Sequence, residues 1–345
     1  MNYIETVSSE VRKYFKILEP VFPEWLEKYI ATPRMQKQAG VGMNCGIIYS
    51  DLFPESYFYS SLEHSVAVAL IIWHFTHDKK QTLAGLFHDI ATPAFKHCID
   101  YMNGDYMKQE STEELTTKTI KESPDICTLL KRDGIEVDEI DDYHQYPIAD
   151  NDTPQLSADR LEYSLSGSVF VYSKNTLEQV AGIYNDLEIQ HNSNGEVELG
   201  FKTKKYAREF VKITCEMSVI YRDDRTRYTM QLIADILKKL NMDGQIRAED
   251  LYELSEAEVI KIIGKSKYAK TFEIWKSAKR VKVSDTEPSG VYYVHHGSKV
   301  RYIDPLVKGE RISDICKIAK NYINKNLAYD MNNYIYLDRI KENLQ

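Results

Sequence analysis

Three short, well-separated stretches constrain this chain more than any other feature, because each carries metal-binding side chains at or near the end of an expected helix. His64 lies in SSLEHSVAVAL, and the adjacent residues His88 and Asp89 lie in LAGLFHDIATP. Asp159 lies in LSADRLEY. Two imidazoles and two carboxylates suit an octahedral divalent ion that keeps positions open for water, whereas closed structural zinc sites favour thiolates. These four candidate ligands predict one bound divalent metal ion (Mn, Fe, Mg, Ni or Co).

Each candidate ligand also has an alternative interpretation as a purely structural residue. His64 could be a core histidine with a protein partner, and Asp159 could cap the helix in which it lies. For the four residues together the structural interpretation is much weaker, because an adjacent His-Asp pair on an apolar helix is expensive to bury without a partner. Neutral imidazole and ionised carboxylate are the protonation states that metal binding requires.

Composition argues against several broad classes of function. The 345 residues are 43 % hydrophobic, which is enough for a substantial core, and the net charge is -8. An acidic chain is a poor general binder of nucleic acid or of an anionic membrane, but a local basic pocket for a phosphorylated small molecule is compatible with it. The longest apolar run, 66–73, is too short to cross a bilayer. The cysteines lack a CxxC pair and the first residues lack an apolar signal core, so we expect a cytoplasmic protein with reduced thiols.

The spacing of apolar residues predicts a mostly helical chain. Asp78 is expected to cap the helix that carries His88 and Asp89, and Pro93 is expected to end that helix. A further helix is expected to place Asp159 in its first turn. The expected helices cover 8–30 with a break near Pro20 and Pro23, 62–77, 110–122, 125–132, 204–240 with a break at 221–228, a helix-turn-helix pair over 247–266 and a last helix at 312–326, with loops at 40–56 and 138–154.

Near the end of the chain the pattern changes. Ser255, followed three residues later by Glu258, is expected to cap a helix. VYYVHHGSKVRYID reads as a β-hairpin that turns near Gly297. We therefore expect an all-α domain over residues 1–280 and a small α+β C-terminal lobe over 281–345, made of a hairpin and a helix.

The three metal-binding stretches resemble a known family. SSLEHSVAVAL, AGLFHDIATPAFKH and SADRLEY look like motifs of the HD-domain metal-dependent phosphohydrolases, and most of all those of the dGTPase-like branch, the deoxynucleoside triphosphate triphosphohydrolases. The resemblance implies an all-α HD-domain core with one divalent ion on the four candidate ligands, and it implies that several copies assemble. Such an ion lowers the pKa of a bound water and polarises a phosphoryl oxygen. The resemblance spans roughly 30–310 and also includes 32–46, 94–100, 107–115, 247–263 and 299–307.

The resemblance also assigns residues to a substrate cleft. The matching positions are His97, Asp100, Glu110, Arg160 and Tyr163. His97 and Arg160 can hold phosphate oxygens. Asp100 or Glu110 can orient a water or take a proton, so that His97, Asp100 and Glu110 are the candidate catalytic residues. Tyr163 offers a ring and a hydroxyl to the substrate.

Two charged segments further along the chain have competing interpretations. YRDDRTRY (221–228) matches a family helix that faces the nucleotide, which makes Arg225 and Tyr228 candidate substrate-binding residues; the alternative is an ordinary charged helix face. The basic segment 261–283 has interleaved aromatic residues, a pattern found in nucleic-acid binders. The acidic net charge favours a solvated helix face there, so a nucleic-acid partner is the weaker interpretation.

Three positions depart from the family pattern. Thr92 and Gln109 stand where the triphosphohydrolases have histidine, and Ser61 stands where they have arginine. All four candidate metal ligands are present, whereas some of the family residues that bind triphosphate and transfer protons are missing. We expect a phosphohydrolase that uses metal-activated water on a nucleotide, with deoxynucleoside triphosphates among the candidates, or on a related phosphate ester. The alternative is a nucleotide-binding regulatory protein that keeps the metal site with little or no turnover.

Overall fold

The computed structural model describes residues 2–104, 107 and 115–344, and the chain is mostly helical (54 %) with a small sheet region. Within these ranges, no helix has both the length and the apolar composition needed to cross a membrane. The helices are α1 Tyr3–Thr6, α2 Ser9–Leu18, α3 Glu27–Ile30, α4 Pro33–Lys37, α5 Ser61–Thr76, α6 Lys79–Phe87, α7 Cys98–Met102, α8 Thr116–Lys121, α9 Pro124–Asp133, α10 Ala158–Ser166, α11 Leu177–Tyr184, α12 Lys204–Ile220, α13 Asp224–Met242, α14 Glu256–Lys265, α15 Ala269–Lys276, α16 Ile312–Ile315 and α17 Lys317–Leu327.

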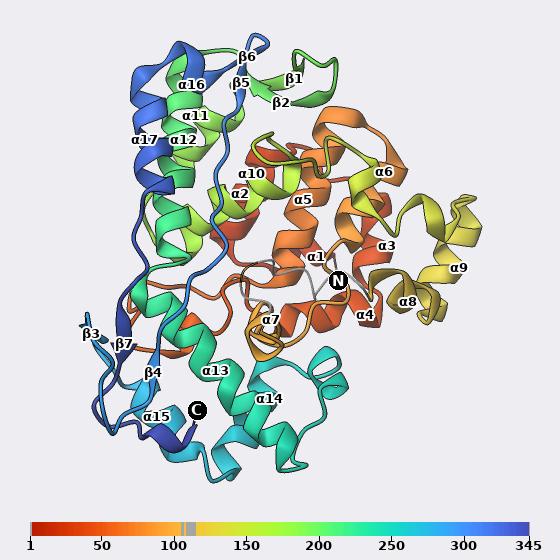
Figure 1. Ribbon diagram of the computed structural model, residues 1–345. Helices are drawn as coiled ribbons and strands as arrows, with labels where there is room; N and C mark the ends of the chain where they lie inside the picture. The colour runs from red at the N-terminus through yellow and green to blue at the C-terminus, as the bar shows by residue number, and fades with distance from the viewer. Residues whose placement is uncertain (1, 105–106, 108–114, 345) are drawn as a thin grey trace.

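The strands are short and form two small sheets. They are β1 Leu187–His191, β2 Val197–Phe201, β3 Lys282–Ser284, β4 Tyr293–Val294, β5 Leu306–Val307, β6 Glu310–Arg311 and β7 Tyr334–Tyr336. One sheet has the order β1-β2-β5-β6 and the other has the order β3-β7-β4. Figure 1 shows both sheets at the edge of the molecule, while α5 lies near its centre and packs against α2, α6 and α10. Helices α12 and α17 pack side by side on one flank.

Helix α5 is buried along most of its length, and its start is fixed by a capping box. The Ser60 hydroxyl accepts a hydrogen bond from the Glu63 backbone N–H, and the Glu63 carboxylate accepts one from the Ser60 N–H. Helix α6 runs back along α5 and touches it where Gly85 meets Ile72. A Cβ atom on Gly85 would lie 2.2 Å from Ile72 Cδ1, so any larger residue would have to displace the end of the Ile72 side chain. The close packing brings the end of α6 beside the start of α5.

Most of the expected helix boundaries are confirmed. Asp78 caps α6, and Ser255 and Glu258 form the expected capping box at the start of α14. The break between α12 and α13 is confined to 221–223. The helix expected at 110–122 is seen as α8 from Thr116 onward, since 108–114 lie outside the described residues. These boundaries follow local capping chemistry, which is why sequence alone indicates them.

The expectation that Pro93 ends the second of these helices is wrong. Helix α6 ends at Phe87, His88 is its C-cap residue, and the chain then turns. The carbonyl groups exposed by this turn are satisfied from the preceding segment: the Gln38 side chain donates to the Ile90 carbonyl and the Lys37 ammonium donates to the Thr92 carbonyl, each at 2.7 Å. Side chains distant in sequence therefore allow the helix to stop early.

The hairpin expected at 291–304 is also wrong. Strand β4 pairs with β7, with Tyr293 opposite Tyr336 and Val294 opposite Ile335. Residues 299–304, all of them described, form no strand. The segment is held by α12 instead, where the Ser218 hydroxyl donates to the Arg301 carbonyl. Pairing with a partner some forty residues away leaves no local turn signal.

A hairpin that the sequence analysis missed joins β1 to β2. Its turn has Asn192, whose side chain accepts from the N–H of Asn194 and Glu196, and Gly195 at a positive φ of 81°. The Asn-Gly pair in this turn is an available sequence signal. Strand β2 pairs in parallel with β5, so the sheet joins segments on both sides of residue 280. The division of the chain at that residue remains a prediction.

Candidate metal centre

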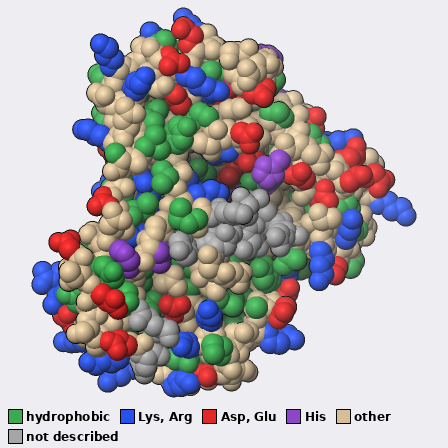
Figure 2. Space-filling model, viewed as in Figure 1, with side chains coloured by type: hydrophobic (Ala, Val, Ile, Leu, Met, Phe, Trp, Pro, Cys, Tyr) green, Lys and Arg blue, Asp and Glu red, His purple; other side chains and the backbone are tan. Residues whose placement is uncertain are grey.

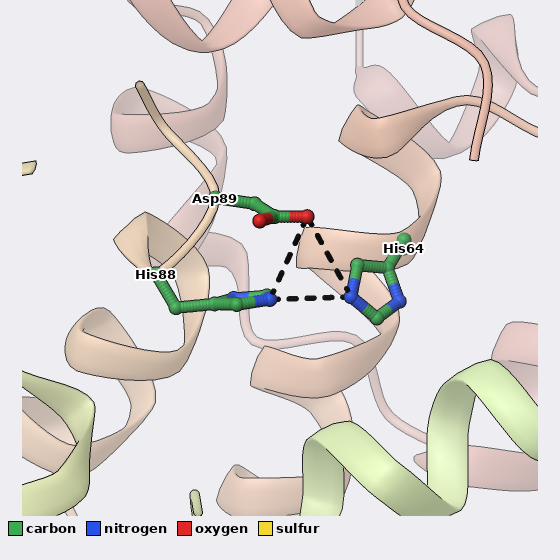
Figure 3. Close-up of side chains that lie close together, drawn as sticks. All are labelled: His64, His88 and Asp89. Atoms are coloured by element: carbon green, nitrogen blue, oxygen red, sulfur yellow. Dashed lines mark hydrogen bonds and ion pairs between the residues drawn. The ribbon is translucent and has the colours of Figure 1, made fainter. Parts of the chain in front are cut away.

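Three helix ends bring the candidate ligands together. His64 lies in the first turn of α5, His88 is the C-cap residue of α6 with Asp89 directly after it, and Asp159 lies in the first turn of α10. The cap of α10 is Ser157, whose hydroxyl accepts from a backbone N–H, so Asp159 is not needed as a cap. Figure 3 shows the side chains of His64, His88 and Asp89 pointing toward one another.

Ligand atoms of His64, His88 and Asp89 all lie within 4.8 Å of one another, close enough to share one ion. His64 Nε2 lies 3.2 Å from His88 Nε2 and 3.1 Å from Asp159 Oδ1. Asp89 Oδ2 lies 3.9 Å from His64 Nε2 and 3.8 Å from His88 Nε2. Bonds of about 2.0–2.2 Å to one ion place neighbouring ligand atoms about 3–3.5 Å apart and opposite ones about 4 Å apart. The separations from His64 Nε2 to His88 and to Asp159 match neighbouring ligands, whereas Asp89 Oδ2 lies farther from both imidazoles than a neighbouring ligand would.

The outer nitrogens of both imidazoles are already bonded within the protein. His88 Nδ1 lies 2.7 Å from the Gly85 carbonyl oxygen and donates to it, because a carbonyl can only accept. His64 Nδ1 faces the Glu162 carboxylate and donates to it in the same way. Both rings therefore turn their Nε2 atoms toward each other and toward two carboxylates. With a divalent ion bound between them, both rings would be neutral and would offer their Nε2 lone pairs to it, so the residues fit such an ion.

Glu162 is a candidate positioning residue for His64 that the sequence analysis missed. It is fully buried on α10 and accepts hydrogen bonds from the hydroxyls of Tyr59 (2.9 Å), Ser166 (3.2 Å) and Tyr14 (3.4 Å) as well as from His64. It follows Asp159 by three residues, which puts both carboxylates on one face of the helix. That spacing is the signal that could have identified it. The bonds fix the tautomer of His64.

Charge in this centre is balanced by opposite charge. Burial disfavours the charged form of His64, but the carboxylates of Glu162 and Asp159 raise its pKa to about 9. Burial likewise opposes ionisation of Asp89, yet the nearby Lys96 ammonium and the two imidazoles hold the pKa of that carboxyl well below its ordinary value. The pKa of Asp159 is lowered against the effect of burial by its hydrogen bond to His64. The acids stay ionised, as metal binding requires.

A cavity of about 240 Å³ opens beside this centre and is lined in part by the four candidate ligands. Figure 2 shows a hollow on this face where acidic, basic and histidine side chains meet. Basic groups in the cavity wall come from three segments: Lys96 and His97 follow α6, Arg160 lies on α10, and Lys299 and Arg301 lie between β4 and β5. The cavity therefore joins a cation site to a wall suited to anions.

Of the expected cleft residues, His97 lines the cavity and Asp100 lies behind it. His97 lines the cavity, and its Nδ1 lies 2.9 Å from Asp100 Oδ2. Asp100 is fully buried and is not among the described residues that line the cavity, so it holds the His97 ring from behind. Burial lowers the pKa of His97, against the hydrogen bond to Asp100, which favours the neutral ring. Glu110 lies outside the described residues.

The α10 residues of the expected cleft also line the cavity. The Arg160 guanidinium donates to the carbonyls of Asn151 and Gln155, the latter at 3.0 Å, and lies 3.6 Å from Asp150. Its charge is thus shared with the 150–155 loop. Tyr163 lines the cavity with its ring 6.3 Å from that of Tyr221.

Arg225 and Tyr228 are described residues that do not line this cavity. The Arg225 guanidinium donates to the Leu52 carbonyl and lies over the Phe53 ring. Tyr228 is fully buried with its ring against that of Tyr292. Their contact with a substrate stays a prediction.

The positions that depart from the family pattern are buried where they are described. Thr92 is fully buried, and its carbonyl accepts from Lys37. Ser61 is fully buried at the start of α5. Gln109 lies outside the described residues. Neither Thr92 nor Ser61 is among the residues that line the cavity.

Comparison with known proteins finds relatives in sequence and in fold. No protein-family model matches the chain. The chain is 25 % identical over 248 residues to the uncharacterised protein YdhJ of Bacillus subtilis, covering 71 % of this chain and 73 % of YdhJ. It is 22 % identical over 312 residues to the metal-dependent phosphohydrolase cns2 of Cordyceps militaris, covering 86 % and 83 % of the two chains.

Two solved structures have the same fold. A phosphohydrolase from Bacteroides thetaiotaomicron superposes with a TM-score of 0.61 at 13 % identity, covering 93 % of this chain and 97 % of that one. A hypothetical protein from Aquifex aeolicus superposes with a TM-score of 0.60 at 18 % identity, covering 92 % and 93 %. The chain therefore shares its overall fold with both structures. The shared fold agrees with the mostly helical architecture, with a small sheet region, that the sequence predicts.

Proposed function

We propose that this chain is an HD-type metal-dependent phosphohydrolase that acts on a nucleotide or a related phosphate ester. The observation that carries the proposal is the convergence of two imidazole lone pairs and two ionised carboxylates beside a cavity with a basic wall. The proposal agrees with the names of two similar proteins, since cns2 is called a metal-dependent phosphohydrolase and the Bacteroides structure a phosphohydrolase. The proposed cofactor is one divalent ion, with Mn, Fe, Mg, Ni and Co as candidates.

The ion and the side chains would divide the work of hydrolysis. A divalent ion held by the four candidate ligands would lower the pKa of a bound water and polarise a phosphoryl oxygen. Hydrolysis forms a bond from the water oxygen to phosphorus and breaks the bond to the ester oxygen, which takes up a proton. His97, held by Asp100 in the cavity wall, is the described side chain that we assign to holding or moving that proton. Arg160, Lys299 and Arg301 would attract the remaining phosphate charge.

The finer assignments extend this proposal. We place the chain nearest to the dGTPase-like branch, with deoxynucleoside triphosphates among the candidate substrates and Tyr163 as a contact for the nucleoside. A cytoplasmic location and assembly of several copies belong to the same proposal, with a small phosphorylated molecule as the partner. Neither a membrane nor nucleic acid is part of it.

A second candidate function follows from the buried positions at which the sequence departs from the triphosphohydrolase pattern. Thr92 is enclosed beneath Lys37 and does not line the cavity, and the Arg160 guanidinium is bonded to its neighbouring loop. A site with fewer groups free to handle triphosphate and protons could bind a nucleotide and turn it over slowly. The alternative is a nucleotide-binding regulatory protein that retains the metal.

A metal-supplemented screen separates the two functions. The purified chain is loaded with each candidate metal and incubated with nucleoside tri-, di- and monophosphates and with simple phosphate monoesters. The hydrolase proposal expects product release that depends on metal and is lost in Asp159→Asn. Thermal stabilisation by a nucleotide without any product over hours would support the regulatory alternative instead. Metal-bound protein with neither response would contradict both functions.

A further inference from the structure

Lys96 places a buried ammonium beside the candidate ligands. Its Nζ lies 2.5 Å from Asp89 Oδ2 and 3.3 Å from Met43 Sδ, and its side chain is 6 % exposed. Asp89 Oδ2 is also the oxygen that faces the Nε2 atoms of His64 and His88. One carboxylate oxygen thus lies between the ligand cluster and Lys96.

The backbone around Lys96 is held in an unfavourable conformation that aims this side chain inward. Phe95 and Lys96 have φ values of 64° and 44°, and both belong to the left-handed region that residues other than glycine rarely adopt. Phe95 is fully buried, with its ring 6.2 Å from that of Tyr49 and against Gly46, where a Cβ would lie 2.7 Å from Phe95 Cδ1. Packing around Phe95 therefore fixes the turn. Strained backbone of this kind persists where the surroundings over-determine it, and it is common at functional sites.

The charges of the centre show what Lys96 adds. Asp89, Asp159 and Glu162 bring three carboxylates around the two histidines. A divalent ion leaves one of these negative charges uncompensated, and the Lys96 ammonium neutralises it. A phosphate dianion approaching the centre then meets no net negative charge. Without the ammonium it would enter a site of like charge.

The same arrangement is familiar from sites with two metal ions. There, two cations clamp one phosphoryl group from both sides. Here the second position on Asp89 Oδ2 is taken by an ammonium. Lys96 also lines the cavity, next to His97. Its charge is thus on the side from which a substrate arrives.

We propose that Lys96 is the second cation of this centre and binds a phosphoryl oxygen of the substrate beside the metal. This inference rests on the proposed function and deepens it, because it makes a phosphate dianion the group that the centre recognises. Lys96 contributes a positive charge in the loop that also contains Thr92, one of the positions where the triphosphohydrolase family has histidine. A structural role would be different: Lys96 would only neutralise Asp89 and would leave phosphate binding unchanged once metal is bound.

The test measures the binding of inorganic phosphate to the metal-loaded full chain, freed of excess ion, by isothermal titration calorimetry. The variants are Lys96→Met, which keeps the length of the side chain, and Lys96→Gly, which suits the positive φ and guards against misfolding. Lys279→Met is the matched control, since Lys279 is 76 % exposed and pairs with Asp51. Metal content is measured on every sample by elemental analysis.

We expect both Lys96 variants to hold as much metal per chain as the wild type while phosphate affinity falls at least tenfold. Lys279→Met should bind phosphate like the wild type. Phosphate affinity within twofold of the wild type in the Lys96 variants overturns the inference. So does an affinity that falls only because metal is lost and returns when the ion is resupplied at saturation.

The outcomes for Lys96 and for the hydrolase proposal are distinguishable, because phosphate binding needs no turnover. A chain that hydrolyses no substrate but binds phosphate in a Lys96-dependent way supports the inference and contradicts the hydrolase proposal. A chain that hydrolyses a phosphate ester equally well with Lys96→Met supports the hydrolase proposal and contradicts the inference.

Discussion

The candidate metal centre and the start of α14 both enclose acidic side chains at helix ends, but the pKa values of these acids shift in opposite directions. In the metal centre the pKa values of Asp89 and Asp159 are lowered despite burial, because Lys96 and two imidazoles lie beside them. At the start of α14, burial raises the pKa of Glu256 to about 7, although the Tyr49 hydroxyl donates to its carboxylate at 2.9 Å. Burial without a nearby positive charge raises the pKa of an acid and favours its protonated, neutral form. Enclosed acids that remain ionised therefore indicate a site that attracts cations.

The largest expected effect comes from removing one ligand. Asp159→Asn keeps the shape of the side chain and the Ser157 cap of α10 but removes a negative ligand atom. We expect metal binding to be lost and phosphate release to fall by roughly a thousandfold, the scale of several kcal/mol that a catalytic ion supplies. Asp125→Asn, an exposed acid in the first turn of α9, is the control. Full metal occupancy in Asp159→Asn would show that Asp159 is not a ligand and that its ionised state has no link to metal binding.

The next effect concerns the group that orients His64. Glu162→Gln keeps an acceptor for Tyr59 but no longer fixes the His64 tautomer by charge. Changes of this kind typically weaken metal binding by about 10–100-fold. Competition with a metal chelator measures the affinity, and Glu178→Gln, at an exposed position in the first turn of α11, should leave it unchanged. An unchanged affinity in Glu162→Gln would show that the buried carboxylate is only structural.

The protonated acid gives a pH-dependent effect. The pKa of Glu256 in the folded protein, about 7, lies above the value of about 4.3 for an unfolded glutamate, so its contribution to stability is complete below pH 4.3 and is lost as the pH rises through 7. The loss is on the order of 1–3 kcal/mol. Glu256→Gln should remove this dependence. Lys37, a nearby cation whose pKa burial lowers to about 7, stays in both proteins.

Urea denaturation of both proteins at pH 5 and at pH 8 measures this difference. The wild type should lose more stability between the two pH values than Glu256→Gln does. Equal losses would mean that Glu256 is ionised throughout, as the acids of the metal centre are.

The smallest expected effect is in the cavity wall. Arg160→Met removes a charge that is already shared with the Asn151 and Gln155 carbonyls. We expect the metal content to stay the same and KM to rise by no more than about tenfold, the worth of one charge-assisted hydrogen bond. Steady-state kinetics with the best substrate of the screen gives the number. A fall in kcat with KM unchanged would show that Arg160 acts in the chemical step rather than in substrate binding.

Several helix starts could be predicted from sequence because capping signals are local, whereas the end of α6, which positions His88 and Asp89, could not. Asp78 and Ser255 are caps that act within one turn, and the apolar run of α5 is continuous. The role of Lys96 could not be predicted, because its direction depends on a left-handed turn that contains no glycine. The pairing of β4 with β7 was missed for a related reason, since it depends on contacts between distant segments. Glu162, three residues after Asp159, was accessible to helical spacing but overlooked.

Anomalous X-ray diffraction from crystals loaded with Mn²⁺ tests the central claim most directly. We expect one strong peak within bonding distance of His64 Nε2, His88 Nε2 and the carboxylates of Asp89 and Asp159. A loaded crystal with its peak elsewhere, or with these four side chains bonded only to one another, would contradict the account.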